Sequence, residues 1–421
     1  MDAPADAQRP TARERVLTLF PSLRSRNFRL FFVGQFVSLV GTWMQVVAQG
    51  WLVLELTNSP FLVGVVSALE SLPILLFTLW GGVLADRVRR RRALILLQSL
   101  MLADALALAI LTLGGHITVQ WVMALALVHG TSAAFEVPIR QAFIIEMVGR
   151  EDLMNAIALN SSNFNLTRIF GPALAGLIVG QAGVTPCFFI NAASFVAVIL
   201  CLVLMRDADT APAPSGHSAL STLREGFRYV RDHRQSRALL LLTALYAIFG
   251  FAFISMLPVF ARDVLQTGPA GYGGLMTAVG VGASVGALGM AALGHRVSRL
   301  RLIRWAGIAF ALTLALTALA RDWWVAAAML GVAGCVMILN NVSTNTQLQV
   351  AAPDHLRGRV MGFYSLMVLG MAPFGSLQAG WVSEHFGVPL SLALGGLLTA
   401  VATLRLTGPA PAPSGAAPAH E

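Results

Sequence analysis

The sequence predicts an all-α membrane protein whose twelve transmembrane helices form two pseudo-symmetric six-helix bundles, with both termini in the cytoplasm. Three observations predict this class: the composition, the length of the uncharged runs and the positions of the arginines. Of the 421 residues, 56% are apolar and 12% are charged, whereas soluble domains carry about 45–50% and about 25%. Too few charged groups are present to cover a water-soluble globule, and the apolar content excludes a disordered chain.

The uncharged runs are long enough to cross a bilayer. Runs of 19–27 residues carry no charge or one, and a helix of that length spans a hydrocarbon core of about 30 Å. A transmembrane β-barrel would instead show segments of about ten residues that alternate between apolar and polar. The runs expected to span the membrane are 28–54, 61–85, 93–113, 118–138, 155–181, 184–205, 238–262, 271–294, 302–320, 323–345, 357–381 and 387–405.

The arginine positions orient these spans. All 29 basic residues are arginine, and the net charge is +9. With the N-terminus placed in the cytoplasm, 26 arginines fall in cytoplasmic loops and termini, Arg262 and Arg321 lie outside, and Arg168 lies within a span. Such a bias is typical of membrane proteins, whose cytoplasmic loops collect basic residues. It accounts for the positive charge without nucleic acid, so we expect no nucleic-acid partner.

A long polar segment divides the spans into two groups of six. The segments that we expect are a cytoplasmic N-terminal segment over 1–27, bundles over 28–205 and 238–405, a cytoplasmic linker over 206–237 and a disordered cytoplasmic tail over 406–421.

The linker contains a helical pattern. Leu220, Leu223, Phe227 and Val230 recur at helical spacing beside three arginines. The pattern predicts an amphipathic helix that lies on the anionic inner leaflet. The alternative is an ordinary solvated helix with a weak apolar face.

The two groups of six resemble each other in their cytoplasmic loops. Segment 84–90 (LADRVRR) resembles 293–299 (LGHRVSR) at an offset of 209 residues, and Gly-Pro at 171–172 matches Ala-Pro at 372–373 at an offset of 201. These matches indicate that a six-helix unit was duplicated. An even number of spans gives both copies the same polarity, which is typical of transporters with two parallel halves around a central pathway.

Segment 82–91 (GVLADRVRRR) resembles the loop between spans 2 and 3 of the major facilitator superfamily, G-x-x-x-D-R-x-G-x-R-R in outline. Arg89 stands where a second glycine is usual, and exporters of the drug and siderophore branch often lack that glycine. Segments 136–141 (EVPIRQ), 155–160 (NAIALN) and 165–176 (NLTRIFGPALAG) are similar to the same branch.

The last of these segments contains Gly171, Pro172 and Gly176. It resembles the Gly-Pro signature on span 5 of proton-coupled antiporters, although the upstream glycines are missing. The likeness covers nearly the whole chain. It implies a monomeric secondary transporter in the cytoplasmic (inner) membrane that exports an amphipathic, drug-like molecule by proton antiport with alternating access. A siderophore or lysophospholipid as substrate is the alternative.

The loop after span 2 is expected to act as a conformational latch. Asp86 is placed to cap the N-terminus of span 11, where free N–H groups and the helix dipole favour an anion, and Arg90 is expected to meet Glu136. Both contacts would favour the outward-facing state. The alternative is that the arginines only enforce orientation, which we accept for Arg91 and Arg92. The latch candidates are Gly82, Asp86, Arg87, Arg90, Glu136 and Arg140.

Three ionisable residues lie near the middle of predicted spans: Glu70, Asp104 and Arg168. Such groups are costly in lipid and are functional candidates for that reason. Because Arg168 keeps its charge, we expect one carboxylate to pair with it and the other to bind and release a proton. Span 2 borders the opposite half in the resembled fold, so Glu70 is the expected carrier. The alternative is a purely structural ion pair.

Polar and aromatic residues on spans 1, 4, 7 and 10 are the candidates for a substrate cavity, because those spans line the cavity in the resembled fold. Amides and aromatic rings give a weakly selective wall that suits amphipathic molecules. Hydrogen bonding between helices and apolar packing are the alternatives. The candidates are Gln35, Trp43, Gln45, Gln49, His129, Phe249, Phe253, Asn340, Asn341 and Asn345.

Other classes of function are disfavoured. The sequence has no Walker A motif, so ATP is not expected to drive the protein. Cys187, Cys201 and Cys335 have no metal-ligand spacing, and we expect neither a metal, nor a cofactor, nor an enzyme's nucleophile and base. Substrate, protons and lipid are the expected partners. An uncoupled facilitator would not need Glu70, and a membrane receptor would usually carry a sizeable soluble domain.

Overall fold

The computed structural model describes residues 20–149, 151–206, 227–293 and 297–407, and all regular elements within these ranges are helical. The N-terminal half consists of η1 (Pro21–Arg24), α2 (Arg26–Thr57), α3 (Pro60–Ala85), α4 (Arg90–Leu113), α5 (Val119–Val148), α6 (Leu153–Ala182) and α7 (Thr185–Val203). The C-terminal half consists of α9 (Arg234–Leu245), η2 (Tyr246–Gly250), α10 (Phe253–Val259), η3 (Phe260–Val264), α11 (Pro269–Leu293), α12 (Arg299–Leu319), α13 (Trp323–Ala351), α14 (Asp354–Gly370), α15 (Ala372–Phe386) and α16 (Val388–Leu406).

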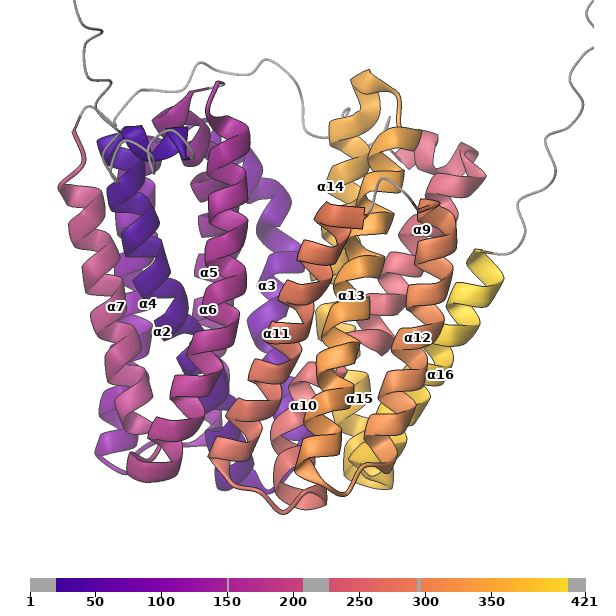
Figure 1. Cartoon of the computed structure of the whole chain (residues 1–421). Coiled ribbons are helices and arrows are strands. Elements are labelled where there is room, and N and C mark those ends of the chain that lie inside the picture. The colour runs from indigo at the N-terminus through magenta and orange to yellow at the C-terminus, as the bar shows by residue number, and fades with distance from the viewer. Residues whose placement is uncertain (1–19, 150, 207–226, 294–296, 408–421) are drawn as a thin grey trace, which may run out of the picture.

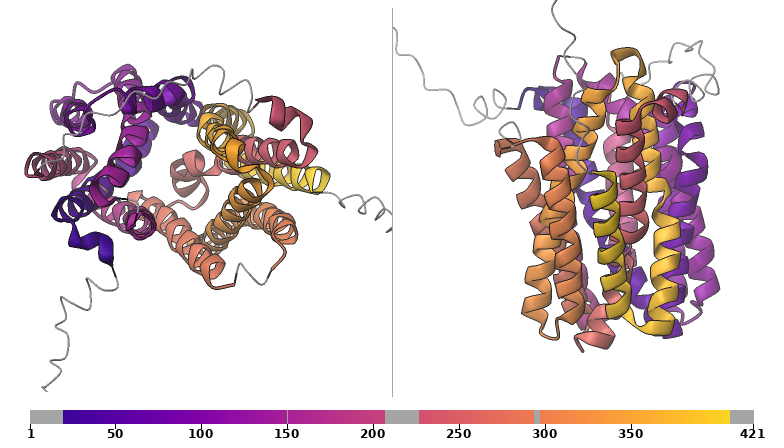
Figure 2. Two further views of the ribbon diagram at one scale, coloured as in Figure 1. Left: turned by 90° about the horizontal axis from the view of Figure 1, so that it is seen from above. Right: turned by 90° about the vertical axis from the view of Figure 1, so that its right-hand side faces the viewer.

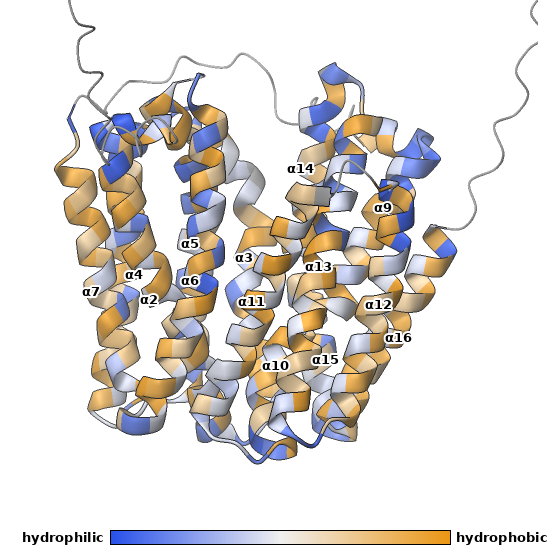
Figure 3. Cartoon of the chain, in the orientation of Figure 1, coloured by the Kyte–Doolittle hydropathy of each residue, from blue (hydrophilic) through white to orange (hydrophobic). Residues whose placement is uncertain are grey.

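Eleven helical segments in the described part of the chain are long and apolar enough to cross a membrane. The predicted span 155–181 falls within α6, which has 30 residues but is not among these segments. Asparagines and Arg168 lower its mean hydropathy, so the twelfth span stays a prediction. Hydropathy mapped on the chain shows apolar residues along the helices and polar residues gathered toward their ends (Figure 3).

At the start of α2 and of α3, a side chain satisfies a free backbone N–H group. The hydroxyl of Ser25 accepts a hydrogen bond from the N–H of Phe28 at the start of α2. At its end, Asn58 adopts the left-handed conformation with a φ of 52°, which asparagine tolerates better than most residues. Ser59 then caps α3 by accepting from the N–H of Leu62. Such caps stabilise a helix by about 1 kcal/mol each.

The two halves lie side by side, as Figures 1 and 2 show. They meet along two seams, α6 with α11 and α3 with α15. Small residues let the backbones approach: a Cβ at Gly273 would lie 2.7 Å from the Cα of Gly176, and one at Gly64 would overlap the carbonyl oxygen of Ser376. Glycine is therefore required where the halves touch.

Two predicted spans are not single helices. The run 238–262 is divided into α9, η2, α10 and η3, where η2 and η3 are π-helical. The run 357–381 is divided at Met371 into α14 and α15, and Pro373 lies in the first turn of α15. Its repeat partner Pro172 lies inside the continuous helix α6. Proline removes a backbone donor, and the two copies accommodate that loss differently.

The end of the linker packs on the C-terminal half. Residues 227–232 are helical, and the hydroxyl of Tyr229 donates to the carbonyl oxygen of Ala351 at 2.8 Å. Leu220 and Leu223 of the predicted amphipathic helix lie outside the described residues, as do most of the predicted N-terminal segment and of the tail. The interfacial helix therefore stays a prediction.

Candidate functional site

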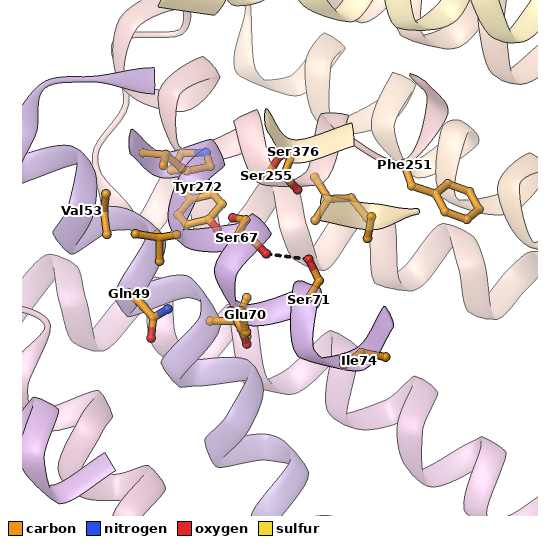
Figure 4. Close-up of a pocket in the computed structure, with 17 residues that line it drawn as sticks. Gln49, Val53, Ser67, Glu70, Ser71, Ile74, Phe251, Ser255, Tyr272 and Ser376 are labelled. Carbon is orange, nitrogen blue, oxygen red and sulfur yellow. Dashed lines mark hydrogen bonds between the residues drawn. The ribbon is translucent and has the colours of Figure 1, made fainter. Parts of the chain in front are cut away.

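A cavity of about 300 Å³ lies between the two halves. Its walls are mainly apolar, with a few polar groups, as is usual for sites that bind small molecules (Figure 4). The lining residues are Val46, Gln49, Gly50, Val53, Val63, Val66, Ser67, Glu70, Ser71, Ile74, Phe251, Ile254, Ser255, Pro258, Tyr272, Ala372 and Ser376.

Helix α3 supplies the acidic wall. Its lining residues recur at helical spacing, so they share one face, and Glu70 is the acid among them. The hydroxyl of Ser71 donates to the carbonyl oxygen of Ser67 at 2.8 Å, as Figure 4 shows. This bond satisfies the Ser71 hydroxyl within its own helix. The carboxyl group of Glu70 is consequently the strongest polar feature of this face.

The opposite half supplies Tyr272 from the start of α11. This side chain is only 3% exposed, and its ring stacks on Trp51 of α2 with centroids 6.4 Å apart. A Cβ at Gly50 would lie 3.3 Å from the hydroxyl oxygen of Tyr272. Tyr272, which stacks on an aromatic ring of the other half, therefore forms part of the cavity wall.

A second acid lies behind Glu70, on the side away from the opposite half. Gly130 of α5 packs against the backbone of Glu70, because a Cβ there would overlap the carbonyl oxygen of Glu70. Next to Gly130, the Nδ1 atom of His129 lies 3.5 Å from Oδ2 of Asp104 on α4, which is too long for a good hydrogen bond. Glu70 is close enough to interact electrostatically with both residues, so α3, α4 and α5 bring three titratable side chains together.

The expected pairing of Arg168 with a carboxylate is wrong. The Nε and Nη2 atoms of Arg168 are buried and have no hydrogen-bond partner among the described residues. The backbone of Arg168 faces α11, because a Cβ at Gly280 would lie 2.8 Å from its carbonyl oxygen. Helix α11 has no acidic residue, and the acids of α3 and α4 lie beside α5 instead.

The expected contact of Arg90 with Glu136 is also wrong. Arg90 Nη1 binds Oε2 of Glu146 at 3.1 Å, whereas Oε1 of Glu136 accepts from Nε of Arg140 at 2.9 Å and from Nε2 of Gln98 at 3.4 Å. Helix α5 continues past its predicted end at residue 138 to Val148. Glu146 therefore lies about 15 Å further along the axis than Glu136, level with the start of α4.

The remaining latch candidates lie at the junction of α3 and α4. Asp86 is the C-terminal cap residue of α3, and it makes at least one further interaction. A Cβ at Gly82 would meet nothing within 4 Å, so this glycine is not required for packing. Arg87 is exposed. The latch function of these residues stays a prediction.

The predicted cavity residues on spans 1 and 4 are placed differently from one another. Gln49 lines the cavity between the halves. Gln45 accepts from Nδ2 of Asn191 at 2.6 Å and so joins α2 to α7. Trp43 contacts Gly171 of α6. Gln35 is buried with 4% exposure. His129 lies beside Asp104, as described above.

The candidates on spans 7 and 10 mostly join helices of the C-terminal half. Nδ2 of Asn340 donates to the carbonyl oxygen of Ile303 at 3.0 Å, and Oδ1 of Asn341 accepts from the hydroxyl of Tyr364 at 2.6 Å. Asn345 accepts from Gln349 within α13. Phe253 packs on Phe310 with ring centroids 6.1 Å apart, and the carbonyl oxygen of Phe249 lies at Gly395. Here the alternative, hydrogen bonding and packing between helices, describes most of the contacts.

Sequence reasoning missed Tyr272, Ser255 and Ser376, which line the cavity from α11, α10 and α15. These three side chains are uncharged, so the criterion that found Glu70, a charge within an apolar run, does not find them. The Gly-Pro motif, by contrast, lies at a seam: the carbonyl oxygen of Pro172 and the Cα of Gly176 both face Gly273 of α11.

Residues 17–414 match the family described as transmembrane secretion effector. The chain belongs to this family of major facilitator transporters. It is therefore a multi-pass membrane transporter and not an enzyme.

Characterised relatives cover most of the chain. It is 24% identical to the staphyloferrin A transporter of Staphylococcus aureus (strain NCTC 8325 / PS 47), over 89% of this chain and 94% of the relative. It is 27% identical to the multidrug efflux pump Tap of Mycolicibacterium fortuitum, over 87% and 92%. It is 26% identical to the enterobactin exporter EntS of Shigella boydii serotype 4 (strain Sb227), over 90% and 88%.

Solved structures share the fold. The nucleoside transporter NupG superposes with a TM-score of 0.72 at 12% identity, over 90% of this chain and 98% of that one. A bacterial homologue of the human lysosomal transporter Spinster, in an inward-facing and unoccupied conformation, gives a TM-score of 0.71 at 13% identity, over 91% and 96%.

Proposed function

We propose that this transporter exports an amphipathic small molecule from the cytoplasm in exchange for protons, by alternating access. The observation that carries the proposal is the carboxyl group of Glu70 in the wall of the cavity between the halves. A carboxyl at this position can meet both the substrate and water. It can therefore exchange a proton with whichever side of the membrane the cavity faces.

The arrangement of α3 supports coupling between protonation and conformation. One face of α3 lines the cavity, and the same helix packs on α15 of the other half. A change of charge on Glu70 consequently acts on a helix that moves relative to its neighbour whenever the halves rock. The pair of Asp104 and His129 lies behind Glu70 and adds to the electrostatic environment of its carboxyl group.

The cavity lining favours a drug-like substrate over a siderophore. Apolar side chains, hydroxyl groups and one carboxylate line it, and the lining residues include no arginine. A polyanionic siderophore would find no cationic partner there, whereas a neutral amphipathic molecule needs none and a cationic one could pair its charge with Glu70. Siderophore export stays the second candidate because two of the relatives are siderophore transporters by name.

We place the protein in the cytoplasmic membrane as a monomer, with both termini inside. The bias of 26 arginines toward one side, against two on the other, supports this orientation. The start of α2 and the end of α16 lie at the same end of the molecule (Figure 1), as an even number of spans requires. This end is called the cytoplasmic end below, and the opposite end the outer end.

The test compares the wild-type protein with Glu70→Gln in inside-out vesicles under an imposed pH gradient, using ethidium uptake as readout. The amide keeps the size of the side chain but cannot carry a proton. We expect Glu70→Gln to lose uphill accumulation while it still exchanges ethidium across the membrane without a gradient. Ser67→Ala, on the same face of α3, is the matched control and should retain accumulation. Uphill accumulation by Glu70→Gln at the wild-type level would remove the coupling role and favour an uncoupled facilitator.

A further inference from the structure

We propose that the cytoplasmic end of the seam between α2 and α7 binds one anionic phospholipid, through its phosphate and one acyl chain. A second cavity, of about 320 Å³, opens there and is lined by Arg26, Arg29, Leu30, Val33 and Cys201. It lies wholly within the N-terminal half, apart from the cavity between the halves. The proposal does not depend on the transported substrate.

The lining residues of α2 share one helix face. Positions 26, 29, 30 and 33 follow the spacing i, i+3, i+4 and i+7, which places them along one side of a helix. The arginines occupy the cytoplasmic turn, and Val33 lies about 10 Å deeper. A basic level above an apolar level matches the order of a phospholipid, whose phosphate lies above its acyl chains.

Helix α7 forms the other wall and fixes the size of the cavity. A Cβ at Gly34 would lie 3.1 Å from Cβ of Cys201, so the two helices touch just below Val33. At the cytoplasmic end, Nδ2 of Asn27 donates to the carbonyl oxygen of Arg206 at 2.7 Å, and the N–H of Arg206 donates to Oδ1 of Asn27 at 3.2 Å. The cavity is therefore held between two fixed contacts.

The two arginines are available to a phosphate. Nη1 of Arg29 donates to the carbonyl oxygen of Leu23 at 3.0 Å, which orients the guanidinium group and leaves its remaining N–H groups for a ligand. Arg26 is exposed. Guanidinium groups bind phosphate oxygens through paired hydrogen bonds, so adjacent arginines suit one phosphate better than a single residue would.

The end of α7 does not oppose an anion. Its last carbonyl groups would present the negative end of the helix dipole, but Arg91 covers them. Nε of Arg91 donates to the carbonyl oxygen of Leu202 at 2.7 Å, and Nη2 donates to that of Val203 at 2.6 Å. The residues that line the cavity also include no acid. Among the described residues, the charged side chains that line this cavity or cover the end of α7 are therefore arginines.

The lower part of the cavity suits a hydrocarbon chain rather than water. Val33, which lines the cavity below the arginines, is 58% exposed. Large apolar side chains at this exposure face lipid in a membrane-spanning helix. A free phosphate ion would use the arginines but would leave this apolar surface uncovered, so we assign the site to a lipid.

The test measures phosphatidylglycerol binding to the purified full-length protein in detergent by native mass spectrometry. Phosphatidylcholine with the same acyl chains serves as the zwitterionic comparison, and glycerol 3-phosphate serves as the soluble phosphate. We expect one phosphatidylglycerol to be retained more tightly than phosphatidylcholine. The double variant Arg26→Gln/Arg29→Gln should lower its affinity at least about tenfold.

Two further variants separate this site from general attraction to a basic surface. Arg301→Gln/Arg304→Gln removes two arginines with the same spacing from the cytoplasmic end of α12, and it should leave the tight binding unchanged. Val33→Trp keeps both arginines but fills the apolar part of the cavity, and it should lower the affinity for phosphatidylglycerol. Thermal unfolding in detergent checks that each variant is folded.

Three results would overturn the proposal. Equal retention of phosphatidylcholine would show that the charge of the headgroup is not recognised. An equal loss of affinity in the Arg301/Arg304 variant would show general surface attraction. Displacement of the lipid by glycerol 3-phosphate, together with normal binding to Val33→Trp, would assign the cavity to a soluble phosphate instead. None of these results depends on proton coupling or on the exported substrate.

Discussion

The carboxylate of Glu384 on α15 accepts a hydrogen bond at 3.0 Å from the backbone N–H of Phe61 at the start of α3, in the opposite half. It also accepts from the hydroxyl of Ser59, the N-terminal cap residue of α3, at 2.9 Å. At the end of α2, just before Ser59, Arg262 of the C-terminal half donates to Oδ1 of Asn58 at 2.9 Å and to the carbonyl oxygen of Leu54 at 3.2 Å. The C-terminal half thus caps the end of α2 and the start of α3, which joins the two halves at the outer end.

Glu384→Ala should shift the protein toward opening at the outer end. Loss of a cap costs about 1 kcal/mol, which corresponds to an approximately fivefold increase in the open population. The measurement is the rate at which a membrane-impermeant thiol reagent labels Val63→Cys, a lining position, in a background without the native cysteines. Asp322→Ala is the matched control, because Asp322 caps α13 within one half and should not alter labelling. An unchanged rate for Glu384→Ala would show that this contact does not hold the outer end closed.

Gly130→Ala should destabilise the protein. The added methyl group would overlap the backbone of Glu70, and overpacking of this kind costs about 1–3 kcal/mol. Thermal unfolding in detergent should show a lower Tm, and transport should fall with it. Gly82→Ala is the control with equal chemistry, because the space around Gly82 is open and its Tm should not change. If Gly82→Ala keeps its Tm but loses transport, Gly82 acts in the conformational change rather than in packing.

Asp104→Asn should impair uphill transport less than Glu70→Gln does. Asp104 faces His129 within the N-terminal half and is 3% exposed, whereas Glu70 lines the cavity. The amide keeps the shape of the buried side chain, so folding should be largely preserved. Both variants are assayed in vesicles under the same imposed pH gradient, with protein levels matched. Loss of accumulation in Asp104→Asn alone would mean that the two acids have been assigned the wrong way round.

Arg90 and Glu146 should show coupled effects on stability, whereas Arg90 and Glu136 should not. The Arg90–Glu146 pair is partly buried, with side-chain exposures of 20% and 14%, and a coupling energy of about 1 kcal/mol is reasonable for such a pair. A double-mutant cycle with Arg90→Gln and Glu146→Gln, measured by unfolding in detergent, gives this energy. The same cycle with Glu136→Gln serves as comparison. A larger coupling with Glu136 would contradict the arrangement described above.

The positions of most helices could be predicted from the sequence because lipid imposes a simple requirement. Spans carry little or no charge over about 20 residues, so the run 93–113 corresponds to α4 (Arg90–Leu113) and the run 387–405 to α16 (Val388–Leu406). The same criterion does not identify the part of a helix that extends beyond the lipid. Helix α5 continues ten residues past its predicted end, and this extension places Glu146 opposite Arg90.

The candidate site could be predicted only in part. Glu70 stood out because a charge within an apolar run needs a reason. The partners of Asp104 and Arg168 depend on how α4, α5, α6 and α11 are rotated about their axes, and sequence spacing along one helix does not contain that information. Tyr272 and Ser376 reach the cavity for the same reason, since the packing of two bundles decides which faces meet.

The glycine contacts at the two seams, Gly176 with Gly273 and Gly64 with Gly380, have a consequence for the rate of the proposed change between inward-facing and outward-facing states. Backbone surfaces without side chains can slide past one another without any rotamer having to change, so motion along them meets little friction. The hydrogen bonds of Glu384 and Arg262 lie instead at the end of α2 and the start of α3, at the outer end of the molecule. In the proposed alternating-access cycle these hydrogen bonds must break when the outer end opens, so the turnover rate should respond more to substitutions at this end than to conservative changes in the lipid-embedded seams.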